Sequence, residues 1–79
     1  MRVSYKKLWK ILIDRNMTKT RLQNLAHLSS ASIAKLGKNE NVTTDILVKI
    51  CGVLKCDITE ILELEKTDFD NTQENEDGN

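Results

Sequence analysis

The chain is poor in residues that break helices or cross-link small proteins. Its 79 positions include no proline, three glycines and two cysteines. Two cysteines are too few for the disulfide framework of a small secreted domain, and no apolar run approaches the roughly 20 residues of a membrane-spanning helix. The N-terminal segment MRVSYKKLWK lacks the apolar core of a secretory signal peptide. We therefore expect a cytoplasmic protein with no membrane partner.

The sequence also lacks the residue sets that perform catalysis or hold a metal ion. His27 is the only histidine, and it reads as a turn residue because no cysteine or carboxylate stands beside it at helical spacing. Cys51 and Cys56 are five positions apart and no zinc-type set completes them; Cys56 falls in a turn, so a reactive thiol there stays open. Asp57 and Glu60 fit a helix-capping box better than an acid/base pair. We expect no enzyme, cofactor or metal.

Charge is distributed unevenly along the chain although the total is zero. Residues 1 to 62 carry eleven basic and five acidic side chains, a surplus of six positive charges, whereas residues 63 to 79 carry one basic and seven acidic side chains. Such an asymmetry is typical of a basic domain that faces a polyanion and is followed by an acidic tail. We expect one domain over residues 1–64 and a disordered acidic tail over 65–79, because the tail has too few apolar residues to fold.

Apolar residues spaced three and four apart predict five helices and no strand. The inward faces include Ile13 in the first helix and Leu25 in the second. Asn16 stands where a left-handed residue ends the first helix, and Gly37 closes the third. Each helix has a candidate N-cap whose side chain accepts from a free backbone N–H: Ser4, Thr18, Ser29, Thr43 and Asp57.

Residues 19 to 38 read as two short helices joined by a three-residue turn. Ile33 and Leu36 fix the inward face of the second of these helices. At 100° per residue the opposite face carries only small and basic side chains, namely Ser30, Ala31, Ser32, Ala34, Lys35 and Lys38. This is how a small protein places a helix in the major groove of DNA.

Residues 5 to 62 resemble a helix-turn-helix domain of the Cro and lambda-repressor type, the XRE family of transcriptional regulators. The stretch SSASIAKLGKNENVTTDILVKICGVLKCDITEIL is similar to a small, compact branch of bacterial and phage regulators. The resemblance implies an all-α, five-helix lambda-repressor-like fold that binds duplex DNA sequence-selectively through the third helix, usually as a homodimer. Gln23 and His27 depart from the small residue and the turn glycine that are usual in the family. Histidine tolerates positive φ better than most residues.

We expect a transcriptional regulator that acts as a simple repressor, with double-stranded DNA as partner and no small-molecule effector. Ser30, Ala31, Ser32 and Lys35 are the expected base-reading residues. The expected phosphate-binding residues gather at two helix starts and in the loop after the third helix: Thr18, Lys19, Thr20, Lys38, Asn39, Asn41, Thr43 and Thr44. An antitoxin of a toxin–antitoxin pair and a protein-interaction module on the same fold stay open as alternatives. A neighbouring small open reading frame would favour the former, and burial of Lys35 and Lys38 in a dimer interface the latter.

Removing residues 66 to 79 should leave the melting temperature nearly unchanged and raise the affinity for non-specific duplex DNA, most strongly at low salt. The reason is that tail carboxylates compete with phosphate for the basic surface, an attraction screened beyond about 8 Å at physiological salt. Titrations of full-length and truncated protein against random duplex at two salt concentrations measure the effect. Equal affinities at low salt would show that the tail serves solubility or that Phe69 docks on a partner, and a large fall in melting temperature would move the domain boundary.

Overall fold

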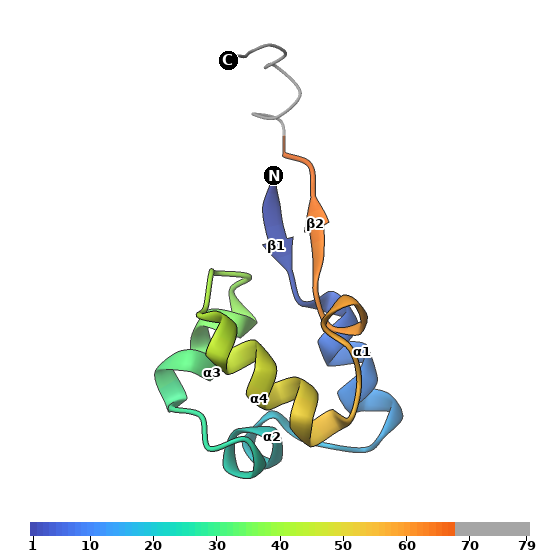
Figure 1. Cartoon of the computed structure of the whole chain (residues 1–79), viewed down its shortest axis with the longest axis vertical. Coiled ribbons are helices and arrows are strands. Elements are labelled where there is room, and N and C mark those ends of the chain that lie inside the picture. The colour runs from blue at the N-terminus through green and yellow to red at the C-terminus, as the bar shows by residue number, and fades with distance from the viewer. Residues whose placement is uncertain (68–79) are drawn as a thin grey trace.

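The computed structural model describes residues 1–67, which form four α-helices, one short 3-10 helix and two strands (Figure 1). Along the chain these are β1 (Arg2–Ser4), α1 (Lys6–Asp14), α2 (Lys19–Leu25), α3 (Ser30–Gly37), α4 (Thr44–Leu54), the 3-10 helix η1 (Ile58–Glu60) and β2 (Glu63–Glu65). Residues 68–79, most of the expected acidic tail, lie outside the described residues. Within residues 1–67 no helix is long and apolar enough to cross a bilayer.

The fold is mostly helical, as the sequence predicts, but the expectation of five helices is not confirmed. The fifth expected helix is only the single turn η1. Its capping box is nevertheless present: the Asp57 side chain accepts from the backbone N–H of Glu60, and the Glu60 carboxylate accepts from Asp57 N–H at 2.9 Å. Asp57 therefore starts a turn correctly while the following apolar residues are too few to extend it.

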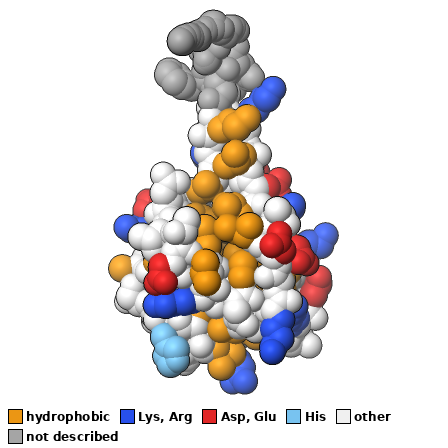
Figure 2. Space-filling model, viewed as in Figure 1, with side chains coloured by type: hydrophobic (Ala, Val, Ile, Leu, Met, Phe, Trp, Pro, Cys, Tyr) orange, Lys and Arg blue, Asp and Glu red, His pale blue; other side chains and the backbone are white. Residues whose placement is uncertain are grey.

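The expectation that the chain contains no strand is wrong. β1 and β2 pair antiparallel, with Val3 opposite Leu64, and form a ribbon that leaves the helical body in Figure 1. Leu64 stays 61% exposed, and Figure 2 shows hydrophobic side chains in a band that begins on this ribbon and continues over the face below it. On the polar side of the ribbon, Arg2 Nε and Lys6 Nζ each lie 3.7 Å from a carboxylate oxygen of Glu65.

The same ribbon moves the start of the first helix. Ser4 was expected to be its N-cap, but Ser4 ends β1 and Tyr5 is the N-cap. The Ser4 hydroxyl still accepts from Lys6 N–H at 3.3 Å. Both Ser4 and Tyr5 are almost fully buried, so the chain enters α1 from inside the domain and not from its surface.

The core lies between the four helices, and each helix contributes at least one fully buried side chain. Leu8, Leu22, Leu36 and Ile50 have no exposed surface. Two residues expected to face inward do not: Ile13 is 73% exposed and Leu25 is 42% exposed. They stand at or next to the last residue of α1 and α2, where the helix ends before a neighbouring element can cover the side chain.

Three of the four positive-φ residues stand in the connections between helices, and the fourth caps α4. Asn16 and His27 have φ angles of 53° and 56°, which confirms both expectations. Asn39 and Lys55 adopt the same left-handed conformation at 57° and 54°, with Lys55 at the C-cap of α4. His27 lies in the turn between α2 and α3, so its backbone conformation sets the direction in which α3 leaves α2.

Replacing His27 by valine should destabilise the domain by about 1–2 kcal/mol, because a β-branched residue is strained in the left-handed region. His27→Asn is the matched control, since asparagine adopts this conformation readily, and it should stay within about 0.5 kcal/mol of the native protein. Thermal melts compare the three proteins. Equal melting temperatures for the valine and asparagine variants would contradict a fixed left-handed turn.

Candidate nucleic-acid interface

The turn between α2 and α3 orients the helix that the sequence selects as the DNA-reading element. Leu22 and Ala26 on one side and Leu28 and Leu36 on the other are buried, and Leu28 N–H donates to the Gln23 carbonyl at 2.9 Å. These contacts direct one side of α3 into the core. The opposite side of α3 is left facing solvent.

Both helices of this pair begin at the expected caps. The Thr18 hydroxyl accepts from Arg21 N–H at 3.0 Å, and the Ser29 hydroxyl accepts from Ser32 N–H at 3.1 Å. The hydroxyls of Ser29 and Ser32 also lie 3.0 Å apart. The caps therefore fix the first turn of each helix, and at Ser32 they engage a side chain that was expected to contact bases.

The solvent face of α3 carries the expected base-reading residues in two different settings. Ser30, Ala31 and Lys35 are exposed, whereas Ser32 is half-buried and bonded to the cap. A serine hydroxyl has one donor and two acceptor positions, so after its bond to Ser29 the Ser32 hydroxyl can still bond a ligand. None of the side chains of α3 is acidic, and nothing on the helix itself opposes the approach of phosphate.

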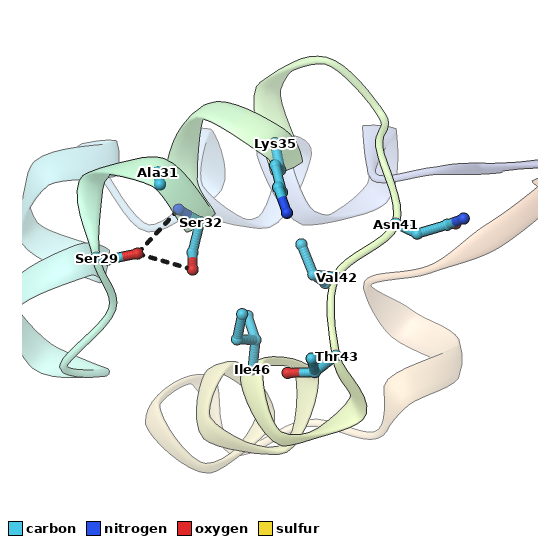
Figure 3. Close-up of a pocket in the computed structure, with 8 residues that line it drawn as sticks. All are labelled: Ser29, Ala31, Ser32, Lys35, Asn41, Val42, Thr43 and Ile46. Carbon is cyan, nitrogen blue, oxygen red and sulfur yellow. Dashed lines mark hydrogen bonds between the residues drawn. The ribbon is translucent and has the colours of Figure 1, made fainter.

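A hollow of about 490 Å³ opens beside α3 (Figure 3). Lys35 extends from α3 toward this hollow, while Val42 and Ile46 face it from the other side. Lys35, an expected base-reading residue, thus lies close to Asn41 and Thr43, which were expected to bind phosphate. Val42 and Ile46 were not singled out from the sequence as part of a site. Val42 directly precedes the cap Thr43, a position where apolar residues often pack on the following helix.

Tyr5 anchors the loop that forms the far side of this hollow. Its backbone N–H donates to Asn39 Oδ1 at 3.0 Å, and its phenol hydroxyl donates to the Glu40 carbonyl at 2.8 Å. The ring is 1% exposed, and burial raises the pKa of Tyr5 while a backbone hydrogen bond at Val42 partly opposes the rise. From the sequence, Asn39 was expected to bind phosphate. In the structure the Asn39 amide oxygen serves Tyr5.

The start of α4 differs from the starts of α2 and α3. Thr43 is the N-cap, as expected, but its side chain makes no capping hydrogen bond. Asn41, Thr43 and Thr44 are exposed, and Asn41 and Thr43 line the same hollow as Lys35. Asp45 in the first turn pairs with Lys49 at 3.3 Å, which offsets the one carboxylate near this helix start.

On the other flank of α3, Lys19 at the start of α2 is exposed and its ammonium lies 4.5 Å from the centre of the Trp9 ring. Thr18 and Thr20 are exposed beside it, and Lys38 is exposed at the end of α3. Of the expected phosphate-binding residues, Lys19 therefore lies beside the end of α3, and Asn41 and Thr43 line the hollow with Lys35.

Cysteine and acidic side chains outside this surface were also considered as candidate sites. Among residues 1–67 no group of three or more histidine, cysteine or acidic residues could hold a metal ion. Burial raises the pKa of the Cys51 thiol, and neighbouring Cys56, Asp57 and Glu60 raise it further. A raised pKa disfavours the thiolate, which is the reactive form of cysteine.

Two of three comparisons with known proteins give a match. A family model described as a Cro/C1-type HTH DNA-binding domain matches residues 7–67, which include all of α2, α3 and α4. The crystal structure of transcriptional regulator VanUg, form II, matches with a TM-score of 0.77 and 53% sequence identity over 78% of this chain and 83% of that chain. No curated protein matches.

Stability should fall at high pH through Tyr5. Because its folded pKa lies above the ordinary value of about 10, the neutral phenol stabilises the fold below that pH, and this contribution is lost as pH rises through the raised pKa. Tyr5 is the only tyrosine, so an ultraviolet titration of phenolate reports it alone. The native midpoint should exceed that of the urea-unfolded chain.

Tyr5→Phe is the control for the loss of stability at high pH, because the lysines still titrate in this variant while the phenol is absent. The difference in melting temperature between native protein and variant should shrink above pH 10, about the ordinary tyrosine pKa. A native midpoint equal to the unfolded one would contradict a buried, hydrogen-bonded phenol.

Proposed function

Because the chain belongs to the family of Cro/C1-type HTH DNA-binding domains, we propose that it is a sequence-selective transcriptional regulator that reads the major groove of duplex DNA with α3. Membership confirms the resemblance drawn from the sequence. One observation carries the proposal: the solvent face of α3 is exposed, small and basic, with Lys19 near its end on one side and Asn41 and Thr43 across the hollow from Lys35 on the other. The 53% identical VanUg structure, described as a transcriptional regulator, supports the regulatory role.

Base recognition falls to the first two turns of α3. Lys35 donates to guanine O6 or N7, the Ala31 methyl meets a thymine methyl, and Ser30 accepts or donates at either edge. Ser32 contributes through the hydrogen-bonding positions of its hydroxyl that the bond to Ser29 does not use. With one long side chain among four readers, discrimination relies on Lys35 and on groove shape.

Phosphate contacts come from the two flanks of α3 and fix the position of the domain on the duplex. On one flank stand Thr18, Lys19 and Thr20. The opposite flank is formed by the Tyr5-anchored loop and by α4, with its exposed start, and contributes Lys38, Asn39, Asn41, Thr43 and Thr44. Asn39 donates through its amide nitrogen, since its oxygen accepts from Tyr5.

We assign the protein to repression by a homodimer on a two-fold related operator. Occupying a promoter is the simplest way for a small DNA-binding domain to regulate, because no second activity is needed. Two copies place two α3 helices about 34–36 Å apart, one turn of duplex, and so double the number of bases read.

An electrophoretic mobility shift with the DNA upstream of its own gene tests the proposal directly. The expected result is a complex on this DNA that survives an excess of random duplex, with two half-sites one turn apart in a footprint. Equal affinity for upstream and random DNA would contradict sequence-selective binding. A footprint with only one half-site would contradict binding as a homodimer.

Lys35→Ala should weaken operator binding by about 1–3 kcal/mol and relax the preference at one base pair, as expected for a base-edge contact. Lys38→Ala, at the C-cap of α3, is the control, because loss of a phosphate contact should weaken binding to all sequences alike and lower the salt slope by about one. Competition titrations on operator and random duplex separate the two effects. If Lys35→Ala binds both DNAs with native affinity, Lys35 is not a reader.

A further inference from the structure

Three helices meet around the ammonium of Lys19. Lys19 is the first residue of α2, and its Nζ lies 4.5 Å from the centre of the Trp9 ring of α1. A side chain at Gly37, the last residue of α3, would place its Cβ 3.9 Å from the same Nζ. The ammonium therefore rests between the indole and the end of the helix assigned to the major groove.

Trp9 does more here than fill the core. Its ring is half-buried and packs against the buried cluster, while one face meets the cation. An ammonium within about 6 Å of a ring centre is attracted by the ring quadrupole, and tryptophan is the strongest partner. In residues 1–67 no ion pair competes for Lys19, since the recorded pairs involve Arg2, Lys6 and Lys49.

We propose that Trp9 is a positioning residue for DNA binding: its ring holds the Lys19 ammonium beside α3, ready to meet a backbone phosphate. The inference rests on the proposed function, because the phosphate belongs to the duplex that α3 reads. Trp9 itself touches no DNA in this arrangement. It acts only through Lys19.

The advantage of such a hold is entropic. A free lysine side chain has many rotamers and must give them up when it binds phosphate. Contact with the indole removes much of this freedom before DNA arrives. The ring occupies one side of the ammonium, so N–H donors on its other side stay available to a phosphate oxygen.

Exposed cation–π contacts are weak, and their loss should lower the affinity for duplex about two- to fivefold. The loss should be the same for operator and random DNA, since phosphates carry no sequence information. The salt slope should stay at its native value, because Lys19 still binds the phosphate, although its side chain then loses more conformational entropy on binding. Lys19→Ala should instead lower the slope by about one.

Tryptophan analogues give a test that leaves the packing in place. Trp9 is the only tryptophan, so growth with 5-fluorotryptophan and a difluorinated analogue changes this ring alone and weakens its quadrupole in steps. We expect affinity for random duplex to fall stepwise with fluorination in the native background and to stay constant in the Lys19→Ala background. Equal melting temperatures across the series exclude a general loss of stability.

Constant affinity along the fluorinated series, with DNA binding intact, would overturn the positioning role and leave the proposed function standing. Failure of the unsubstituted protein to bind any duplex would overturn both. A stepwise fall that persists in Lys19→Ala would also overturn it, because the ring would then act on DNA without the lysine.

A measurement without DNA checks the contact itself. Lys19→Met keeps most of the side-chain volume but removes the charge, so it should change the intensity or wavelength of Trp9 emission in the free protein. Lys10→Met, a change at an exposed lysine next to Trp9 in α1, should leave the emission unchanged. Identical spectra for the native protein and Lys19→Met would show that the cation does not rest on the ring, and the proposal would fall.

Discussion

The two hydrogen bonds of Tyr5 fix the loop after α3, and the shape of the proposed DNA surface depends on that loop. One bond reaches the Asn39 side chain and the other the Glu40 carbonyl. Both bonds are partly buried and Tyr5 itself is 1% exposed, and a buried group that loses its partner costs about 1–3 kcal/mol. The loop therefore has one favourable position, and it holds Val42 and Thr43 across the hollow from Lys35.

The two flanks of α3 are supported by different physics. On one side Tyr5 holds the loop through two directional bonds, its backbone N–H to the Asn39 amide oxygen and its phenol hydroxyl to the Glu40 carbonyl. On the other side an aromatic ring attracts a cation, a contact that tolerates small displacements. Both supports come from α1 or the residue that caps it, although α1 itself presents no residue to the proposed DNA surface. The first fifteen residues thus shape a site whose contacts all lie further along the chain.

The sequence predicted the features that depend on a single residue and its neighbours. Thr18 and Ser29 cap their helices and His27 takes positive φ, because each follows from local backbone chemistry. The exposed face of α3 followed from Ile33 and Leu36 alone. The family resemblance and the matched family model agree on the same helices.

What the sequence did not reveal involves partners far apart along the chain. The three-residue strands are too short to show alternation, and Val3 meets Leu64 only in the folded domain. The role of Tyr5 needs Asn39 and Glu40 beside it, and Leu25 is exposed because α2 ends there. The base and phosphate assignments stay predictions, since no contact with DNA tests them.

The ribbon has a consequence for how the domain opens. β1 and β2 join the two ends of the described chain, so the ribbon forms only after the helices have brought those ends together. Three residue pairs with Leu64 exposed give it little stability of its own. It should be the first element to fray, and fraying would free the chain immediately before Tyr5. A partner that binds β2 or displaces β1 would thereby loosen the loop that Tyr5 holds, so the pairing of two short strands can affect the proposed DNA surface.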